Sequence, residues 1–524
     1  MRRSALLAAA VLLSAISCDR AAGLRQRRDP GALVVAQPSD VEGLDPVLVT
    51  DSESIEVGEI LFEGLTRWKP GTADVEAGLA QDWRVSPDGL AWTFDLRTGV
   101  HFHDGEKLDA AAVVFSFGRV LDAKHPQYLA GEGGSYWRGL LKDVVAVTAI
   151  DVDTVEIRVA RPYAPLLADL AVFPIVAPAA VEKWGKEFAQ HPVGTGPFAF
   201  EAWNVGEEVV VKRFDGYWGQ RPQLDRIVFR TVDDARQRLV DLESGSVDLA
   251  MAILPDEQDF VELHPDLKLY HAHSADVTYL AFNTSHPPFD DLRVRRAFAY
   301  AINKEPIVKL AFQGRATPAD GPLPEGIMGY RMPATVYGYD PVLARKLLGE
   351  AIADGTFDPK RAYVFYAPST PRPYLPQPEE VARFIQASLA QIGVQTDLRL
   401  QPINQHRASV AAGEHDLALF GWIGDTGDPD NFLFVLFSSD TGQNIAQYKD
   451  PVTDKLLKDA QASSDDHTRI ALYGEVQDRI AAAAPWVPIA HSELVVAGRA
   501  ELTGVVLSPL GHPVYPLVRR GEEP

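Results

Sequence analysis

The chain has 524 residues, of which 72 are Asp or Glu and 50 are Lys or Arg, so its formal net charge is −22 at pH 7. Such acidity argues against binding to nucleic acid or to anionic lipid surfaces. The chain holds one cysteine, Cys18, which excludes an internal disulfide; if Cys18 is modified, thiolate metal sites and cysteine nucleophiles are excluded as well. The length is that of roughly three domains.

The first residues have the pattern of an export signal. Arg2 and Arg3 supply a positive start, and Ala5–Ile16 is a run of small and apolar residues interrupted by Ser14. That run is too short to span a bilayer as a stable helix, but it suits the apolar core of a signal peptide. We therefore predict a signal peptide at residues 1–17. Its removal takes away two arginines and changes the net charge from −22 to −24.

Cys18 follows the small residues Ala15, Ile16 and Ser17, a pattern that resembles a bacterial lipobox with Ala15 where leucine is usual. We predict that Cys18 is lipidated and that residues 18–31 form a lipid anchor and a polar tether. Several acyl chains would anchor the protein stably, whereas a single chain gives only marginal binding. A plain secretory signal followed by an unmodified cysteine is the alternative. We find no other apolar stretch long enough to cross a membrane.

The folded body is predicted to mix strands and helices. Ala32–Ala36 opens it as a strand, and further strands are expected at Trp92–Leu96 and Thr154–Val159, between Pro, Gly and Asp turns. Pro378–Ile392 carries apolar residues at helical spacing and ends before a glycine, and Val394–Leu400 reads as the strand that follows it. A helix followed closely by a strand indicates an α/β fold class.

The stretch Ala80–Val120 carries an unusually dense set of distinctive residues. They are Trp83, Ser86–Gly89, Phe94, Leu96, Arg97, Gly99, Val100, Phe102 and His103–Gly105. This set resembles the signature of the family-5 extracellular solute-binding proteins, which are the oligopeptide, dipeptide and nickel receptors of ABC importers.

Five later segments continue the resemblance in the order of that family. They are HPVGTGPF at 191–198, RFDGYWGQRPQLDRIVF at 213–229, LAFNTSHPPFDDLRVRRAFAYAINKEPI at 280–307, YDPVLARKLL at 339–348 and FGWIGDTGDPDNFLF at 420–434. The resemblance runs from about residue 32 to beyond 500, and the chain is identified as a full-length member.

The resemblance implies a periplasmic-binding-protein type II fold of the large three-lobed class, in which two lobes close over a ligand cleft and a third is added. The implied segments are 32–59, 191–280 and 490–524 for the discontinuous lobe I, 60–190 for the extra lobe II, and 281–489 for lobe III. The hinge is expected near residues 275–285 and 485–495.

Two charged residues carry the predicted binding site. The segment 369–377, STPRPYLPQ, and the segment 422–430, WIGDTGDPD, are similar to elements of the dipeptide-binding proteins, and the similarity assigns Arg372 to the peptide carboxylate and Asp425 to its α-ammonium. The chemistry agrees, because a guanidinium donates two parallel hydrogen bonds to a carboxylate and a carboxylate accepts from an ammonium. Two fixed charges would also measure the length of the ligand.

Each of these charges has an alternative interpretation. Arg372 stands between two prolines, which would also suit a stiff surface position. Asp425 would serve equally as a cap in a Gly/Asp-rich turn, or as a calcium ligand together with Asp428 and Asp430, although the spacing does not match an EF-hand loop.

Aromatic residues near these charges are further candidates. Trp422 and Tyr374 flank them and would line side-chain pockets or pack in the core, and Tyr136 lies in a GGSY loop that resembles one facing the cleft in the family. Thr50–Ser54, in the expected loop after the first strand, is a weaker candidate. Gly194–Pro197 is interpreted as a structural turn near the hinge.

An enzyme is the main alternative of another class. The sequence contains no GxSxG, HExxH, Walker A or EF-hand motif. His101 and His103 would share one face of a strand and offer a metal site, although a turn is the favoured interpretation, so we predict no catalytic residue, no metal and no cofactor. A sensor that reports ligand occupancy without transport is a third class.

We therefore predict a monomeric, membrane-anchored lipoprotein at the periplasm or cell surface. Its predicted function is to capture short peptides, dipeptides favoured, and to deliver them to the permease subunits of an ABC transporter. Oligopeptides, glutathione, haem or a nickel complex are the alternative ligands.

Overall fold

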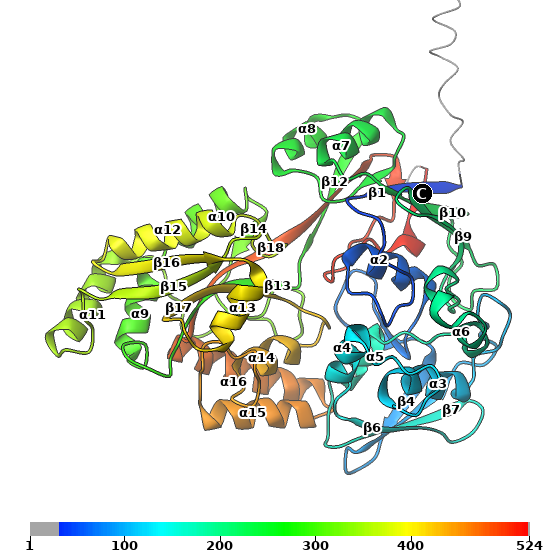
Figure 1. Ribbon diagram of the computed structural model, residues 1–524, viewed down its shortest axis with the longest axis horizontal. Helices are drawn as coiled ribbons and strands as arrows, with labels where there is room; N and C mark the ends of the chain where they lie inside the picture. Colours follow the sequence, from blue (N-terminus) through cyan, green and yellow to red (C-terminus); the bar gives the residue numbers. More distant parts are fainter. Residues whose placement is uncertain (1–30, 522–524) are drawn as a thin grey trace, which may run out of the picture.

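A computed structural model describes residues 31–521, and its central feature is a 12-stranded sheet that runs through both halves of the molecule (Figure 1). The predicted signal peptide and Cys18 lie outside the described residues. The sheet order is β16 (Gln395–Gln401), β15 (Ala362–Pro368), β17 (Leu417–Ile423), β13 (Asp276–Phe282), β18 (Trp486–Arg499), β11 (Leu249–Ala250), β1 (Ala32–Gln37), β10 (Arg226–Thr231), β9 (Glu208–Arg213) and β8 (Phe198–Asn204), and β12 (Leu267–His273) and β14 (Ala316–Pro318) also pair with β18. Parallel and antiparallel pairs are mixed, and the predicted α/β class is confirmed.

The long strand β18 belongs to both halves of this sheet. Its residues 486–492 pair with β13 and β14, and residues 493–499 pair with β12. Where β13 begins, the buried carboxylate of Asp276 accepts a hydrogen bond from the backbone N–H of Ser492 at 2.9 Å and another from the Ser492 hydroxyl. The two strands are therefore tied together where the chain passes between the halves, and this stretch stays our predicted hinge.

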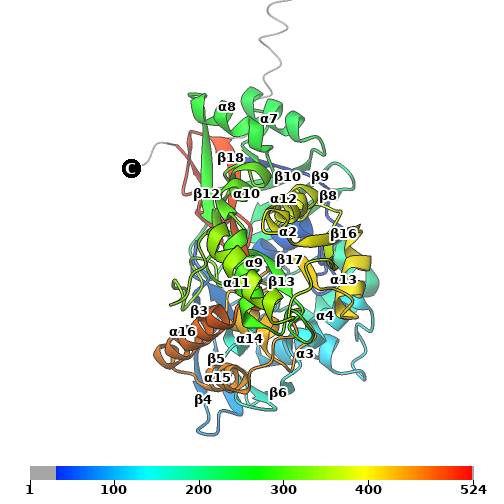
Figure 2. The same ribbon diagram turned by 90° about the vertical axis from the view of Figure 1, so that its left-hand side faces the viewer.

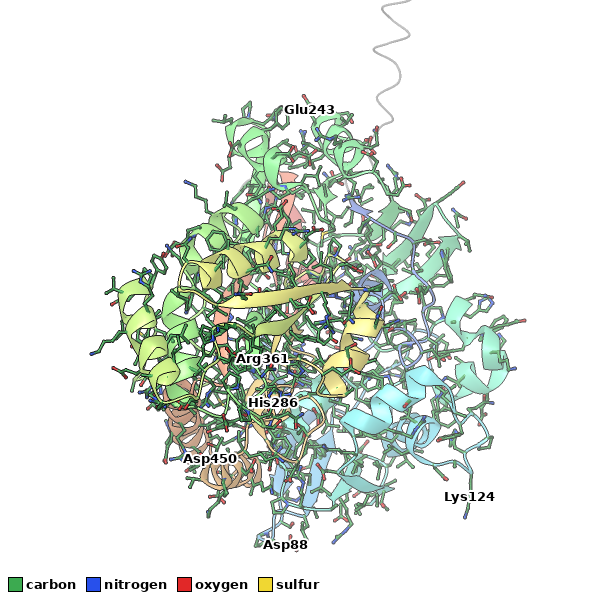
Figure 3. The ribbon with its side chains drawn as sticks, turned by 60° about the vertical axis from the view of Figure 1, so that its left-hand side comes forward. Asp88, Lys124, Glu243, His286, Arg361 and Asp450 are labelled. Atoms are coloured by element: carbon green, nitrogen blue, oxygen red, sulfur yellow. The ribbon has the colours of Figure 1, made fainter. Side chains whose placement is uncertain are left out.

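A separate four-stranded sheet lies within the segment predicted as lobe II. Its order is β4 (Ala80–Val85), β5 (Ala91–Leu96), β7 (Thr154–Val159) and β6 (Val144–Ala149), and all its pairs are antiparallel. Asp88, in the turn between β4 and β5, and Glu243, near the end of α7, lie at opposite ends of the molecule (Figure 3). We keep the lobe names below for the predicted segments, whose exact boundaries stay a prediction.

Helices flank both sheets. They are α2 (Ser52–Leu61), α3 (Ala110–Leu121), α4 (Glu132–Leu140), α5 (Leu166–Val172), α6 (Pro178–Trp184), α7 (Ala235–Ser244), α8 (Gln258–Leu263), α9 (Leu292–Ala301), α10 (Lys304–Ala311), α11 (Pro341–Ala353), α12 (Pro378–Ala390), α13 (Ile403–Ala411), α14 (Asp430–Phe437), α15 (Pro451–Ala462) and α16 (Asp466–Ala483). α15 lies beside the small sheet in both views (Figures 1 and 2), where Ala164 N–H donates to the Gln461 carbonyl at 2.7 Å. Within residues 31–521, no helix combines the length and the apolar character needed to cross a bilayer.

The sequence motifs meet one another in space. His103 donates its backbone N–H to the Gly194 carbonyl at 2.9 Å, and its ring nitrogen contacts the Gly196 carbonyl at 3.0 Å. Burial lowers the pKa of His103 to about 4, so the ring is neutral near pH 7. The two glycines are required because a Cβ at either position would overlap the backbone at the end of α2. The GTGP segment is thus structural, as predicted. Its glycines allow close packing against α2, whereas the prediction was a tight turn near the hinge.

Glu63 joins two further motifs. Its carboxylate accepts hydrogen bonds from the Thr195 hydroxyl at 2.9 Å, the Tyr217 hydroxyl at 2.8 Å and the Trp218 indole N–H at 2.9 Å. Burial raises the pKa of Glu63, while the three donors act in the opposite direction. The HPVGTGPF and DGYWG segments are therefore held together by one carboxylate.

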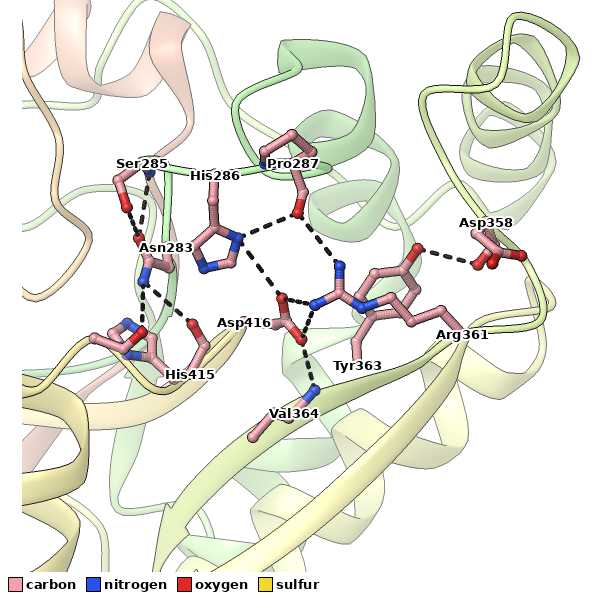
Figure 4. A network of polar contacts seen from close by, with 11 residues as sticks. Asn283, Ser285, His286, Pro287, Asp358, Arg361, Tyr363, Val364, His415 and Asp416 are labelled. Carbon is pink, nitrogen blue, oxygen red and sulfur yellow. Dashed lines mark hydrogen bonds and ion pairs between the residues drawn. The ribbon is translucent and has the colours of Figure 1, made fainter.

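A third network fastens the NTSHPPF segment to the sheet (Figure 4). Asp416, 2% exposed and next to β17, accepts hydrogen bonds from Val364 N–H at 2.8 Å and from the Arg361 guanidinium at 2.7 and 2.8 Å. Asn283 N–H donates to the Asp416 carbonyl at 3.1 Å, and the His286 ring lies 3.9 Å from the carboxylate. The network fixes the starting ends of β15 and β17, the strands that lead to the predicted site.

We expect Glu63→Ala to lower the free energy of unfolding by about 3 kcal/mol, because it leaves three enclosed donors without their acceptor. Urea denaturation followed by circular dichroism measures this change. The control is Glu379→Ala, which removes an exposed pair with Arg383 and should cost less than about 1 kcal/mol. Equal losses in the two variants would show that Glu63 does not hold the motifs together.

Candidate functional site

The two predicted ligand charges leave neighbouring strands at one edge of the large sheet. β15 and β17 pair in parallel, with Phe365 opposite Leu417, so their carboxyl ends meet at the same edge. Arg372 lies four residues beyond the end of β15, and Asp425 lies two residues beyond the end of β17. Ligands of open α/β sheets bind outside such strand ends.

Asn431, in the first turn of α14, orients the loop that carries Asp425. Its side-chain oxygen accepts hydrogen bonds from Asp425 N–H at 3.1 Å and from the Trp422 indole N–H at 2.9 Å. Gly424 N–H donates to the Ala275 carbonyl at 2.8 Å, which ties the same loop to the start of β13. The position of Asp425 is therefore fixed from both sides.

The carboxylate of Asp425 is exposed to solvent yet surrounded by protein, as expected for a group that lines a cleft. The surrounding protein raises the pKa of Asp425, and the hydrogen-bond contribution of Asn431 acts in the opposite direction. No ion pair joins Asp425 to a cation among residues 31–521. This group can accept hydrogen bonds from an incoming ammonium.

Arg372 is held by a tight turn and keeps an unused donor. Its N–H donates to the Leu375 carbonyl at 3.0 Å, and Leu375 N–H donates back to the Arg372 carbonyl at 2.9 Å. The side chain is half-buried, and its Nε has no hydrogen-bond partner within the described residues. No carboxylate between residues 31 and 521 forms an ion pair with it. The guanidinium is available for an anionic ligand group.

Tyr374 packs in the core. It is 4% exposed, and its ring covers Gly421 so closely that a Cβ there would overlap it. The Thr278 hydroxyl donates to its carbonyl. Of the two interpretations of Tyr374, the structure favours packing, and the residue supports the turn of Arg372. Trp422 is half-buried against the core beneath the site.

Tyr136 approaches Asp425 from α4 on the opposite side. It is 39% exposed, and its pKa is raised first by the surrounding protein and then by the charges of Asp425 and Asp169. Gly133 packs directly on the backbone of Val47 and Leu48. Leu48 is 45% exposed, and Ile423, the last residue of β17, is 38% exposed. Neither apolar residue was predicted from the sequence.

One expectation about local structure requires correction. Thr50–Ser54 is not a loop, because Ser52 begins α2 and Asp51 caps that helix by accepting from Ser54 N–H at 2.8 Å. Asp51 serves the helix as its cap, while Thr50 and Ser52 are exposed, so the segment stays a weaker candidate for contacts with a ligand.

The other two carboxylates of the calcium alternative have partners within the protein. Asp428 forms a buried ion pair with Arg469 at 2.6 and 2.8 Å, and Asp430 accepts from the Gln461 side chain at 2.9 Å. Within residues 31–521 there is no group of three or more His, Cys, Asp or Glu residues arranged to hold a metal ion. His103 bonds to the backbone, as described above.

Comparison with known proteins agrees with this geometry. A family model described as bacterial extracellular solute-binding proteins, family 5 middle, matches residues 74–444. The chain is 35% identical to the dipeptide-binding protein of Escherichia coli strain K12, over 91% of this chain and 92% of that protein. It is 33% identical to heme-binding protein A of Haemophilus influenzae, over 90% and 89% of the two chains.

Solved structures give the same result. HbpA2 from Haemophilus parasuis superimposes with a TM-score of 0.89 at 28% identity, covering 94% of this chain and 100% of that one. The ABC transporter-associated periplasmic binding protein DppA from Helicobacter pylori, in complex with the peptide STSA, gives a TM-score of 0.74 at 32% identity over 94% and 98% of the chains. These matches confirm the predicted periplasmic-binding-protein fold class. The chain belongs to the family-5 extracellular solute-binding proteins.

Proposed function

We propose that this protein captures short peptides, with dipeptides favoured, and delivers them to the permease of an ABC transporter. The observation that carries the proposal is the pair of opposite charges at one sheet edge, Asp425 and Arg372, neither of which has an ion-pair partner within the described residues. Zwitterionic peptides match this pair, because their α-ammonium suits Asp425 and their carboxylate suits the Arg372 guanidinium.

The neighbouring residues support the same ligand class. Tyr136 and Ile423 present partly exposed apolar surface near Asp425. Such surface suits peptide side chains without demanding one of them. The similarity to the dipeptide-binding protein of Escherichia coli supports dipeptides.

Haem is the second candidate ligand. The similarity to the haem-binding protein of Haemophilus influenzae favours it. Oligopeptides, glutathione and nickel complexes complete the range of candidate ligands, and ligand sensing without transport is the second candidate role.

The proposal includes the setting of the protein. We infer a monomer that has no enzymatic activity and is anchored through a lipidated Cys18 at the periplasm or cell surface. Ligand capture would close the lobes about β13 and β18, driven by contacts that the ligand makes only in the closed state. The hydrogen bonds between Asp276 and Ser492 would keep the two crossing strands together during closure.

Asp425→Ala and Arg372→Ala should each weaken binding of Ala-Ala by about 2–5 kcal/mol, because each leaves one terminus of the ligand without its charged partner in a closed cleft. Isothermal titration calorimetry of the mature protein measures this loss. Matched controls are Asp259→Ala and Arg236→Ala, which alter exposed residues of α8 and α7 and should leave affinity unchanged. Wild-type affinity in either cleft variant would remove that residue from the site.

Blocking either end of the ligand should have a similar effect. We expect tight binding of Ala-Ala and weak binding of N-acetyl-Ala-Ala, Ala-Ala-amide and tetra-alanine, since each of these loses at least one match to the two charges. Calorimetry on ligand-stripped protein tests the four compounds in parallel. Equal binding of tetra-alanine would assign the protein to the oligopeptide receptors, and no binding of any compound would contradict a peptide receptor and direct the search to haem.

A further inference from the structure

A cavity of about 290 Å³ lies between lobes II and III, next to the loop of Asp425. Lobe II contributes Tyr163 and Asp169 to its wall, and lobe III contributes Thr426, Asp430 and Asn431. Thr426 directly follows Asp425 in the chain, and Asn431 is the residue that orients the Asp425 backbone. The cavity is therefore a neighbour of the proposed ammonium site.

Two of the carboxylates in this wall have no ion-pair partner within residues 31–521. Asp169, from α5, is 2% exposed, and its Oδ2 has no hydrogen-bond partner in the described part of the chain. Asp430, from α14, is 5% exposed and accepts neutral hydrogen bonds from Gln461 at 2.9 Å and Tyr473 at 3.4 Å. Buried charges are costly unless they are paired, so a positive charge is missing here.

Most of the nearby cations already belong to other carboxylates. Arg161 bonds to Asp143 at 3.1 and 2.9 Å, and Arg469 bonds to Asp428 at 2.6 and 2.8 Å. The other charged groups that line the cavity are Asp440, which pairs with Lys458 at 2.6 Å, and Lys142, which is exposed. Asp169 and Asp430 thus have no charged hydrogen-bond partner among the surrounding helices, which are α4, α5, α14, α15 and α16.

Tyr136 connects this cavity to the peptide site. The charges of both Asp425 and Asp169 act on its hydroxyl. A ligand held by Asp425 through its α-ammonium would carry its first side chain from the same carbon atom, so that side chain starts beside Tyr136. The four-carbon stem of lysine is long, flexible and able to lie along apolar surface.

We propose that the cavity between Asp169 and Asp430 is a subsite for the cationic side chain of the first residue of a bound peptide. The proposal rests on the peptide function proposed above and adds a specificity: peptides that begin with lysine or arginine bind more tightly than peptides with a neutral side chain of equal length. The ammonium or guanidinium supplies the positive charge that the two carboxylates lack.

Burial favours a proton on these carboxylates when no cation is bound. Burial and the neighbouring carboxylates raise the pKa of Asp430 to about 7 and raise that of Asp169 well above its ordinary value. An arriving ammonium favours the ionised carboxylates and lowers both pKa values, so near neutral pH a basic side chain should displace a proton into solvent. A neutral side chain should not displace it.

The test is calorimetry with Lys-Ala and norleucyl-Ala, which differ in the side-chain amine and share the α-ammonium and carboxylate. We expect the wild type to bind Lys-Ala about tenfold more tightly or better. The ratio should fall to within about threefold in Asp169→Asn and in Asp430→Asn, each of which keeps the shape of a protonated aspartate. Repeating the titrations in two buffers of different ionisation enthalpy should show extra proton release for Lys-Ala.

The outcomes separate this subsite from the peptide function. Equal affinity for the two dipeptides in the wild type, or an unchanged ratio in both variants, overturns the subsite and leaves the peptide receptor intact. Absence of the extra proton release also overturns it. Failure of both dipeptides to bind overturns the peptide function itself. Asp259→Asn, on exposed α8, is the control that should keep the wild-type ratio.

Discussion

The proposed site depends on two side chains of opposite charge, Asp425 and Arg372, at one edge of the large sheet. Asp425 and Arg372 follow the parallel strands β17 and β15, and no ion pair joins them, which is the basis of their proposed role in binding a ligand. Packing maintains this state: Asn431 fixes the Asp425 backbone, and the Tyr374 ring seated on Gly421 fixes the turn of Arg372. Because these supports come from the protein interior, the two residues are held in place without an ion pair between them.

The most distinctive parts of the sequence serve this rigidity more than they serve the ligand. His103 contacts the GTGP segment through its ring nitrogen. Glu63 accepts hydrogen bonds from the Thr195 hydroxyl and the Trp218 indole. Asp416 accepts a hydrogen bond from the strand that follows Arg361. Each is a polar group in enclosed surroundings whose partners come from far along the chain. Such contacts are expensive to break, because every lost acceptor leaves a buried donor.

Much of this arrangement could be predicted from the sequence, and the limits of the prediction have physical causes. The helix 378–390 and the strands around it follow from periodicity, and Arg372 and Asp425 stand out through their motifs. The sequence left two interpretations of Tyr374 open, since its burial depends on the absence of a side chain at Gly421 on another strand. The sequence also left the calcium alternative open, because the countercharge of Asp428 is supplied by Arg469, 41 residues later in the chain. Sequence distance hides such pairings, and it equally hid the convergence of Asp169 with Asp430.

Carboxylates in this protein are satisfied in different ways, and the differences follow their position. Within a lobe they meet arginine, as Asp428 meets Arg469 at 2.6 Å, or neutral donors, as Asp276 meets Ser492. Asp425, Asp169 and Asp430 lie instead where lobes face each other, and none of them has an ion-pair partner among residues 31–521. A buried carboxylate without a countercharge disfavours the ionised, closed state, and a cation from outside removes that penalty. In the proposed mechanism, these carboxylates would therefore couple closure to the arrival of a positively charged ligand.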